Sequence, residues 1–364
     1  MLIFPYVIFI FYILFIKRTE KSTWVLAASL MAFLSATSTS YVDLNNYVHL
    51  FEYVNYVELS VATQTTGVIW ACLNKLFYFL GFNYRGMVVV MLFLDYYLMH
   101  NAVRRLGGNE NLYFGLFLIF PSIIQLVQFK FFTAFCIVFV GYSILVTSEK
   151  LSRVKYLGFI AIAFLIHTSC VIFSLLLLVK MKHYDRKLFV LITAGLTLFM
   201  VIFLDRIVSI ASRYLNPRLS ARYLTDSITP SSLTWIVLIF IVWLMAYILS
   251  SYLLSNRAFE GTIITSDDSS FNVANYNGMA IEILLLTLPF LLLDRNYHRF
   301  LEMGYSILFV VTGMYITPPR YSRNKMVFIL VLMVLLVMIS YIYCPYETVL
   351  KPVFMFDGFV NVRR

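Results

Sequence analysis

The sequence predicts an all-α, polytopic integral membrane protein built as a helical bundle. Of its 364 residues, 61% are hydrophobic and only 13% are charged, which leaves too few polar side chains to cover a soluble protein. The mean hydropathy is +0.85. Between residues 2 and 343, apolar segments about as long as a bilayer core follow one another, and the charges cluster in the short gaps. We therefore expect a single membrane domain over residues 1–364.

The individual spans follow from segment length. A helix that crosses the bilayer needs roughly 20 apolar residues, or fewer when flanking side chains extend to the interface. Ten segments are apolar and long enough. Together with one further apolar stretch at 156–179, they predict about ten or eleven transmembrane helices. They are residues 2–16, 23–38, 86–102, 112–127, 131–147, 188–204, 233–254, 275–293, 300–317 and 326–343. The first segment is as short as a signal-peptide core, but its basic residues follow it, so we expect an uncleaved helix.

Basic residues set the expected orientation, because cytoplasmic loops carry an excess of Lys and Arg. The segment 39–66 has neither, while it carries Asp43, Glu52 and Glu58, so we expect it to be the first outer loop. The basic clusters and a later Ser-rich loop then fall on the cytoplasmic side: residues 17–21, 104–105, 150–155 and 255–274.

The apolar stretch 156–179 leaves the orientation of the later half open, because basic residues flank it at both ends. If it spans the bilayer, everything downstream is inverted relative to a segment that dips in and returns. A break near His167 would leave two arms of about eleven residues, each ~16 Å long and able to reach mid-bilayer and return. We favour this re-entrant or broken helix around His167, because it places the arginine-rich loop 205–232 outside, beside the acidic first loop.

Several chemistries are disfavoured by what the sequence lacks. The four cysteines show no C-x-x-C spacing and the five histidines are scattered, so neither a disulfide framework nor a bound metal is expected. There is no P-loop, GxGxxG or G-x-S-x-G motif, and we expect no cofactor. The acidic doublet Asp267-Asp268 lacks the D-x-D spacing of a nucleotide-sugar site. The net charge of +10 is explained more simply by contact of basic loops with anionic lipid headgroups than by binding of nucleic acid.

One candidate site lies just beyond the second span, in the sequence Y-V-D-L-N-N-Y-V-H-L-F at residues 41–51. Asp43 and Asn46 offer a carboxylate and an amide beside aromatic rings such as Tyr47. Carboxylates are the usual bases for sugar hydroxyls, and aromatic faces are good sugar platforms. The alternative is that these tyrosines belong to the aromatic belt found at every membrane interface.

A second candidate site is the group of arginines in the loop 205–232. Guanidinium groups bind phosphate bidentately and keep their charge, so such a group at the outer leaflet would suit a lipid-linked pyrophosphate. Attraction to anionic headgroups, or positive-inside signalling in an inverted topology, would explain it equally. The residues are Arg206, Arg213, Arg218 and Arg222, with Tyr214 and Tyr223 beside two of them.

A third set consists of ionisable residues at membrane depth: Lys130, His167, Arg295 and Arg299. Burying an ionisable side chain in a bilayer costs free energy, so such residues usually indicate a functional site. Lys130 could instead extend to the interface, and His167 could hydrogen-bond a neighbouring helix.

Three of these patterns resemble the EpsG family of Wzy-like exopolysaccharide, capsule and O-antigen polymerases. The motif D-x-x-N-Y-x-x-x-F that begins at Asp43, with Glu58 after it, is similar to the family's first outer segment. Q-F-K-F-F-T-A at 128–134, a basic loop and F-L-I-H-T-S at 164–169 resemble its central pattern. Arg299 and Pro318-Pro319 stand where the family has a late arginine and a proline-marked break. Lys130 departs from the pattern, which has an arginine there, and Phe164 lies one residue further from His167 than in Phe-x-His.

The resemblance implies a glycosyltransferase of the bacterial cytoplasmic (inner) membrane, a polymerase that joins oligosaccharide repeat units carried on undecaprenyl pyrophosphate. It implies no cofactor, and a chain-length regulator and a flippase of the same pathway as partners. The expected catalytic residues are Asp43 and His167. The expected pyrophosphate-binding residues are Lys130, Arg213, Arg218, Arg222 and Arg299, and the expected sugar contacts are Asn46, Tyr47 and Tyr223.

Two other activities fit a chain of this kind. A flippase for the same lipid-linked sugar would also use arginines in a central cavity, but it would not need an acid at one surface. A glycosyltransferase that uses lipid-phosphate sugars would also place an acid in the first outer loop, usually with a divalent metal.

Overall fold

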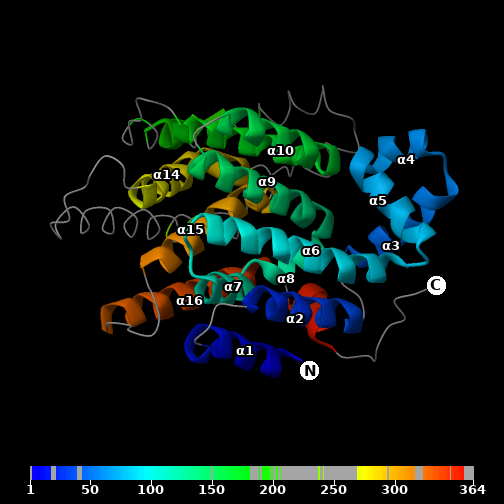
Figure 1. The fold of residues 1–364 in the computed structure, drawn as a ribbon, viewed down its shortest axis with the longest axis horizontal. Helices are drawn as coiled ribbons and strands as arrows, with labels where there is room; N and C mark the ends of the chain where they lie inside the picture. Colours follow the sequence, from blue (N-terminus) through cyan, green and yellow to red (C-terminus); the bar gives the residue numbers. More distant parts are fainter. Residues whose placement is uncertain are drawn as a thin grey trace. The chain divides into compact units, whose positions relative to one another are not determined.

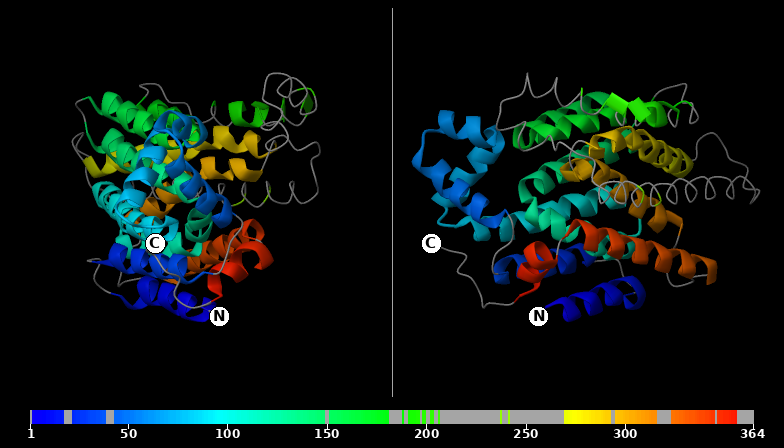
Figure 2. Two further views of the ribbon diagram at one scale, coloured as in Figure 1. Left: turned by 90° about the vertical axis from the view of Figure 1, so that its right-hand side faces the viewer. Right: turned by 180° about the vertical axis from the view of Figure 1, so that it is seen from behind.

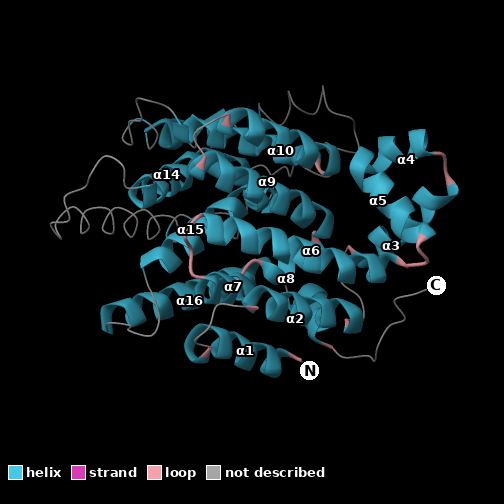
Figure 3. Cartoon of the chain, in the orientation of Figure 1, coloured by secondary structure: helices cyan, strands magenta, loops and turns pink. Residues whose placement is uncertain are grey.

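The structure is a computed structural model, and its described residues are all helical or in connections between helices (Figure 3). This confirms the all-α fold class. The described residues are 2–17, 22–38, 43–148, 151–180, 188, 191–196, 198–199, 202–203, 206, 237, 241, 269–292, 295–315, 323–344 and 346–355.

The first half of the chain contains most of the described helices (Figure 1). They are α1 Ile3–Phe11, the π-helix η1 Tyr12–Ile16, α2 Thr23–Thr37, α3 Leu44–Tyr56, α4 Leu59–Thr66, α5 Val68–Phe79, α6 Tyr84–Arg105, α7 Glu110–Ile119, α8 Ser122–Val127, α9 Phe129–Thr147, α10 Ser152–Ile166 and the 3-10 helix η2 Thr168–Lys180. The later elements are α14 Ser269–Leu284, the 3-10 helices η3 Leu285–Leu292 and η4 Arg295–Leu301, α15 Glu302–Tyr315, α16 Arg323–Tyr343, the π-helix η5 Tyr346–Leu350 and α17 Lys351–Phe354.

Three of the described helices are long and apolar enough to cross a membrane, namely α6, α9 and the part of α16 from Met326–Tyr343. Each coincides with a span that the sequence predicts. Shorter apolar helices occupy four further predicted positions, at Ile3–Ile16, Thr23–Thr37, Glu110–Ile119 and Thr168–Lys180. The chain is therefore a helical membrane protein.

Two predicted elements differ in the structure. The expected span 112–127 is divided into α7 and α8, with Phe120 in extended conformation between them. Proline at 121 has no N–H to continue the ladder of α7, so the division falls at that residue. The expected outer loop 39–66 contains helices α3 and α4, because α3 is amphipathic and buries Leu44, Phe51 and Val54 on one face.

The chain divides into two compact units, Met1–Ser174 with Thr312–Arg364, and Leu175–Val311. In the first unit, α6 packs between α2 and α9, and α10 packs along the other side of α9 (Figures 1 and 2). Helices α3, α4 and α5 lie at the end of these long helices where α6 and α9 begin and α10 ends. In the second unit, α14 packs on η3 and η3 on η4. The single membrane domain expected from the sequence stays a prediction.

Aromatic rings from three helices meet in the interior of the first unit. Tyr96 of α6 stacks on Phe114 of α7 with a centroid distance of 5.7 Å, and it meets Phe117 and Phe132 edge-on at 6.0 and 5.9 Å. Such offset and edge-to-face pairs add to the burial of large apolar area. They fix α6, α7 and α9 against one another.

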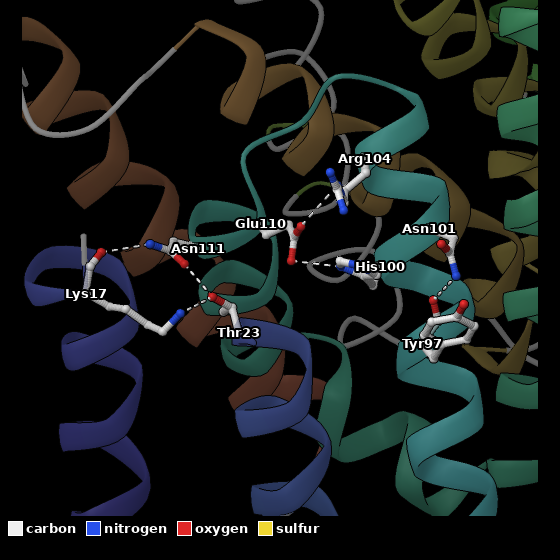
Figure 4. Close-up of polar contacts among 8 residues, drawn as sticks. All are labelled: Lys17, Thr23, Tyr97, His100, Asn101, Arg104, Glu110 and Asn111. Atoms are coloured by element: carbon white, nitrogen blue, oxygen red, sulfur yellow. Dashed lines mark hydrogen bonds and ion pairs between the residues drawn. The ribbon is translucent and has the colours of Figure 1, made fainter. Parts of the chain in front are cut away.

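At the opposite end of α6, a polar network joins α6, α7 and α2 (Figure 4). The buried carboxylate of Glu110 lies 2.9 Å from Nδ1 of His100 and 3.8 Å from Nε of Arg104. Thr23 donates to the side-chain oxygen of Asn111, whose amide in turn donates to the backbone carbonyl of Lys17 at 2.7 Å. These contacts satisfy polar groups where the sequence predicts the cytoplasmic ends of the helices.

The chain turns back at His167. Helix α10 ends at Ile166, His167 is extended with φ −142° and ψ 113°, and η2 begins at Thr168. The hydroxyl of Tyr156, in the first turns of α10, donates to the carbonyl of Phe173 in η2. The predicted broken helix around His167 is therefore present.

Candidate functional site

The first turn of α9 carries a cation to the junction between α4 and α5. The amine of Lys130 donates a hydrogen bond to the backbone carbonyl oxygen of Thr66, the last residue of α4. The side chain is half-buried. A carbonyl holds the ammonium group by its dipole without cancelling the charge, so the cation stays available to an anion that approaches the same junction.

The junction itself is a close approach of two backbones. Gly67 has φ +86°, a conformation that residues with a side chain rarely adopt. A Cβ at this position would lie 3.0 Å from the carbonyl oxygen of Leu165 and 3.3 Å from that of Ile166. Glycine thus allows the start of α5 to pack directly on the carboxyl end of α10, and Trp70 of α5 then meets Phe129 of α9 at 6.3 Å.

His167 lies at the end of α10, immediately after these two carbonyl groups. Its Nδ1 is 2.7 Å from the hydroxyl oxygen of Ser169, and its ring meets Phe131 edge-on at 5.4 Å. The imidazole is half-buried. Because Phe131 is the neighbour of Lys130 on α9, the structure brings both Lys130 and His167 to the meeting point of α4, α5, α9 and α10. We call this group, with Thr66 and Gly67, the junction site.

The residues predicted in the first outer segment belong to a different part of the same unit. Asp43 is the N-cap of α3 but makes no side-chain capping bond, Asn46 is exposed, and Tyr47 stacks on Tyr84 at 5.7 Å. Tyr84 begins α6, so this group lies beside the α5–α6 connection.

Helix α5 separates the two groups. It begins at the junction site, since Gly67 is its N-cap, while Tyr78 in its last turn meets Phe51 of α3 at 6.2 Å. A helix of this length is about 18 Å long at 1.5 Å per residue. The structure therefore does not place Asp43 directly against His167.

Arg299 lies in η4 of the second unit and is half-buried. Its neighbour His298 is fully buried, with Nε2 3.3 Å from the hydroxyl of Tyr305. Burial lowers the pKa of His298 to about 3, because a charged imidazolium is poorly solvated there. The other predicted anion-binding and sugar-contacting residues, Arg213, Arg218, Arg222 and Tyr223, lie outside the described residues.

One buried acid was not singled out by the sequence reasoning. Asp95 lies in the middle of α6, is fully buried, and its Oδ2 accepts a 2.9 Å hydrogen bond from the hydroxyl of Thr133 on α9. The signal that could have found it is simple, because it is the sole carboxylate in the predicted span 86–102.

One of the four cysteines is exposed and can react with thiol reagents. All four cysteines are free thiols; Cys72, on α5, is exposed, whereas Cys136, Cys170 and Cys344 are buried. Within the described residues, no three His, Cys, Asp or Glu side chains gather as metal ligands would.

Comparison with known proteins gives one match. Neither curated proteins nor solved structures contain a match to the chain. The model of the EpsG family matches residues 21–351, which includes α3, the junction site, Asp95 and Arg299. This family is associated with exopolysaccharide biosynthesis polymerases. Since the match covers most of the chain, the protein belongs to the EpsG family.

Proposed function

We propose that this protein is a polymerase that joins undecaprenyl-pyrophosphate-linked oligosaccharide repeat units into a surface polysaccharide, on the outer face of the bacterial cytoplasmic membrane. Membership of the EpsG family supports the pathway. The observation that carries the proposal within the molecule is the junction site, where Lys130 and His167 come from different helices to one end of the bundle.

The reaction needs a cation and a proton acceptor. A hydroxyl of the acceptor repeat attacks the anomeric carbon of the donor chain, and the bond from that carbon to the pyrophosphate oxygen breaks. The electron pair of the broken bond leaves with the lipid pyrophosphate, while the hydroxyl proton passes to a base. Charge therefore grows on the leaving group, and fixed positive groups placed there stabilise the transition state.

Lys130 fits the first role. Its ammonium group is held by the Thr66 carbonyl, so it is oriented before the substrate arrives. A single preorganised donor of this kind is typically worth about 2.7–4 kcal/mol of transition-state stabilisation. Binding of the same pyrophosphate by Arg213, Arg218, Arg222 and Arg299 stays a prediction from the sequence.

His167 fits the second role. Imidazole is neutral near pH 7 when unperturbed and can then accept a proton. The contact between its Nδ1 and the Ser169 hydroxyl fixes the orientation of the ring, and therefore the direction of the second nitrogen. Asp43, Asn46 and Tyr47 lie at the other end of α5, where they would contact sugar units further along the chain.

Deletion of the gene followed by glycan analysis tests the proposal. A strain without the protein should carry single lipid-linked repeats on the outer face of the membrane and no ladder of longer chains. Complementation with wild type should restore the ladder, whereas Lys130→Ala and His167→Ala should not, at equal amounts of membrane protein. Unchanged long chains in the deletion strain would refute the polymerase. Repeats trapped on the cytoplasmic side would instead identify a flippase.

A chelator separates the proposal from a metal-dependent glycosyltransferase that uses lipid-phosphate sugars. Polymerisation by purified protein in detergent should persist in excess EDTA, because the proposed charges come from Lys and Arg side chains. Loss of activity that is restored by added Mg²⁺ or Mn²⁺ would favour the metal-dependent enzyme.

A further inference from the structure

Asp95 is a buried acid that the proposed reaction does not use. It lies halfway along α6, a helix long and apolar enough to cross the membrane, and none of its surface is exposed. An acid at such a position is costly unless its oxygens are engaged. Its Oδ2 accepts a hydrogen bond from the hydroxyl of Thr133, whereas Oδ1 has no hydrogen-bond partner among the residues that the structure describes. Because this burial lowers the stability of the folded chain, we infer that Asp95 has a functional role.

The partner of Asp95 connects it to the junction site. Thr133 is three residues after Lys130 on α9, so the two side chains stand on adjacent turns of the same helix face. The rise between them is about 4.5 Å. A displacement of Thr133 therefore carries Lys130 with it, with little helix between them to absorb the movement.

The first turns of α9 are fixed by contacts in three directions. Lys130 reaches the end of α4, Phe131 meets His167 at the end of α10, and Thr133 bonds Asp95 on α6. The first two contacts belong to the junction site itself. The third joins α9 to α6 through a hydrogen bond, one residue along α9 from the ring contact between Phe132 and Tyr96.

We propose that Asp95 is a positioning residue of the junction site, which holds α9 through Thr133 so that Lys130 meets the leaving pyrophosphate. This inference rests on the proposed polymerase function. Asp95 acts as a hydrogen-bond acceptor and neither transfers a proton nor binds substrate. An asparagine, which keeps a carbonyl oxygen at the same distance, should therefore replace it, whereas an apolar residue of similar size should not.

A double-mutant cycle tests the inference with purified protein and a lipid-linked repeat as substrate. Asp95→Leu and Thr133→Val should each lower kcat about five- to tenfold, as expected for one lost hydrogen bond, with little change in KM. The double variant should be no worse than either single variant, because both remove the same contact. Asp95→Asn and Thr133→Ser should stay near wild-type activity.

Ser143→Ala is the matched control. Ser143 is also a buried hydroxyl of α9, but it bonds the carbonyl of Val140 within its own helix. Its loss should leave kcat unchanged. Melting midpoints of all variants in detergent should be recorded beside the kinetics, to exclude loss of folded protein as the cause.

The outcomes separate the inference from the proposed function. If Asp95→Asn is as inactive as Asp95→Leu, the carboxyl acts through its charge or its proton, and the positioning role is wrong. If the two losses multiply in the double variant, Asp95 acts through another group, and the inference fails. If wild type makes no polymer at all, the proposed function fails, while non-additive melting midpoints would still report the Asp95–Thr133 contact.

Discussion

The hydroxyl of Tyr156 donates a 2.6 Å hydrogen bond to the backbone carbonyl oxygen of Phe173, 17 residues further along the chain. In one continuous helix these residues would stand about 25 Å apart. The contact is possible because the chain reverses direction at His167, between α10 and η2. We expect the basic residues that flank this hairpin, Lys155 and Lys180, to lie on the same side of the membrane.

This reversal predicts the topology of the segment. In a Cys72→Ser background, which removes the exposed native thiol, single cysteines introduced at Lys155 and at Lys180 should both resist a membrane-impermeant maleimide in intact cells. Both should react after permeabilisation. A cysteine at Arg218, in the proposed outer loop, should label from outside without permeabilisation.

The opposite labelling pattern would contradict this topology. If Lys155→Cys and Lys180→Cys label from different sides, the segment crosses the membrane. If Arg218→Cys reacts only after permeabilisation, the arginine-rich loop is cytoplasmic and cannot meet a donor on the outer face.

Replacing Lys130 tests the cation of the junction site. Lys130→Ala should lower kcat by about two to three orders of magnitude, the usual cost of removing one preorganised donor to the leaving group. Lys130→Arg keeps the charge and should retain part of the activity, since its wider fork must fit the same carbonyl of Thr66. Single-turnover rates with a fixed amount of donor would measure both.

Lys75→Ala is the matched control for Lys130→Ala. Lys75 also donates to a backbone carbonyl, that of Val57, at 2.8 Å, and it belongs to the neighbouring helix α5. Its removal should change activity by less than about threefold. Equal losses of activity in the two variants would contradict a specific role of Lys130 in binding the leaving group.

Gly67→Ala should disturb the junction without changing any polar side chain. The added Cβ would lie 3.0 Å from the Leu165 carbonyl oxygen, and alanine is strained at φ +86°. We expect a loss of about 1 kcal/mol or more in unfolding free energy together with reduced polymerisation. Gly158→Ala on α10 is the control, because nothing lies within 4 Å of a Cβ there. Wild-type activity in Gly67→Ala would argue against a close α5–α10 contact.

His298 predicts a specific sensitivity to acid. Its pKa is lowered to about 3 by burial, while an unfolded histidine titrates near 6.5. The unfolded state therefore binds more protons below pH 6.5, so folding stability should fall as the pH drops from there, by about 1 kcal/mol for each unit. Melting midpoints in detergent at pH 7.5, 6 and 5 would measure this slope.

His298→Gln should flatten that slope, because glutamine cannot take up the proton and still offers an amide near the Tyr305 hydroxyl. His49→Gln is the control variant, since the His49 side chain is exposed. An unchanged slope in His298→Gln would assign the acid sensitivity to another group.

The sequence predicted the elements that depend on local composition. Hydropathy located α6, α9 and α16, because a span needs one continuous apolar segment of bilayer length. It also placed the break at His167, where a polar His-Thr-Ser run interrupts an apolar stretch. It missed α3 and α4, because an amphipathic helix at a membrane surface lacks the mean hydropathy of a span.

By itself, the sequence determined that the chain is a helical membrane protein of the EpsG type, and it named Lys130 and His167 as functional residues. Only the tertiary structure decided what these residues contact: Thr66, Phe131 and, through Thr133, Asp95. The physical reason is that hydropathy and motif spacing are properties of neighbouring residues along the chain. The meeting of α4, α5, α9 and α10 depends on how their side chains pack, and at Gly67 on the absence of one.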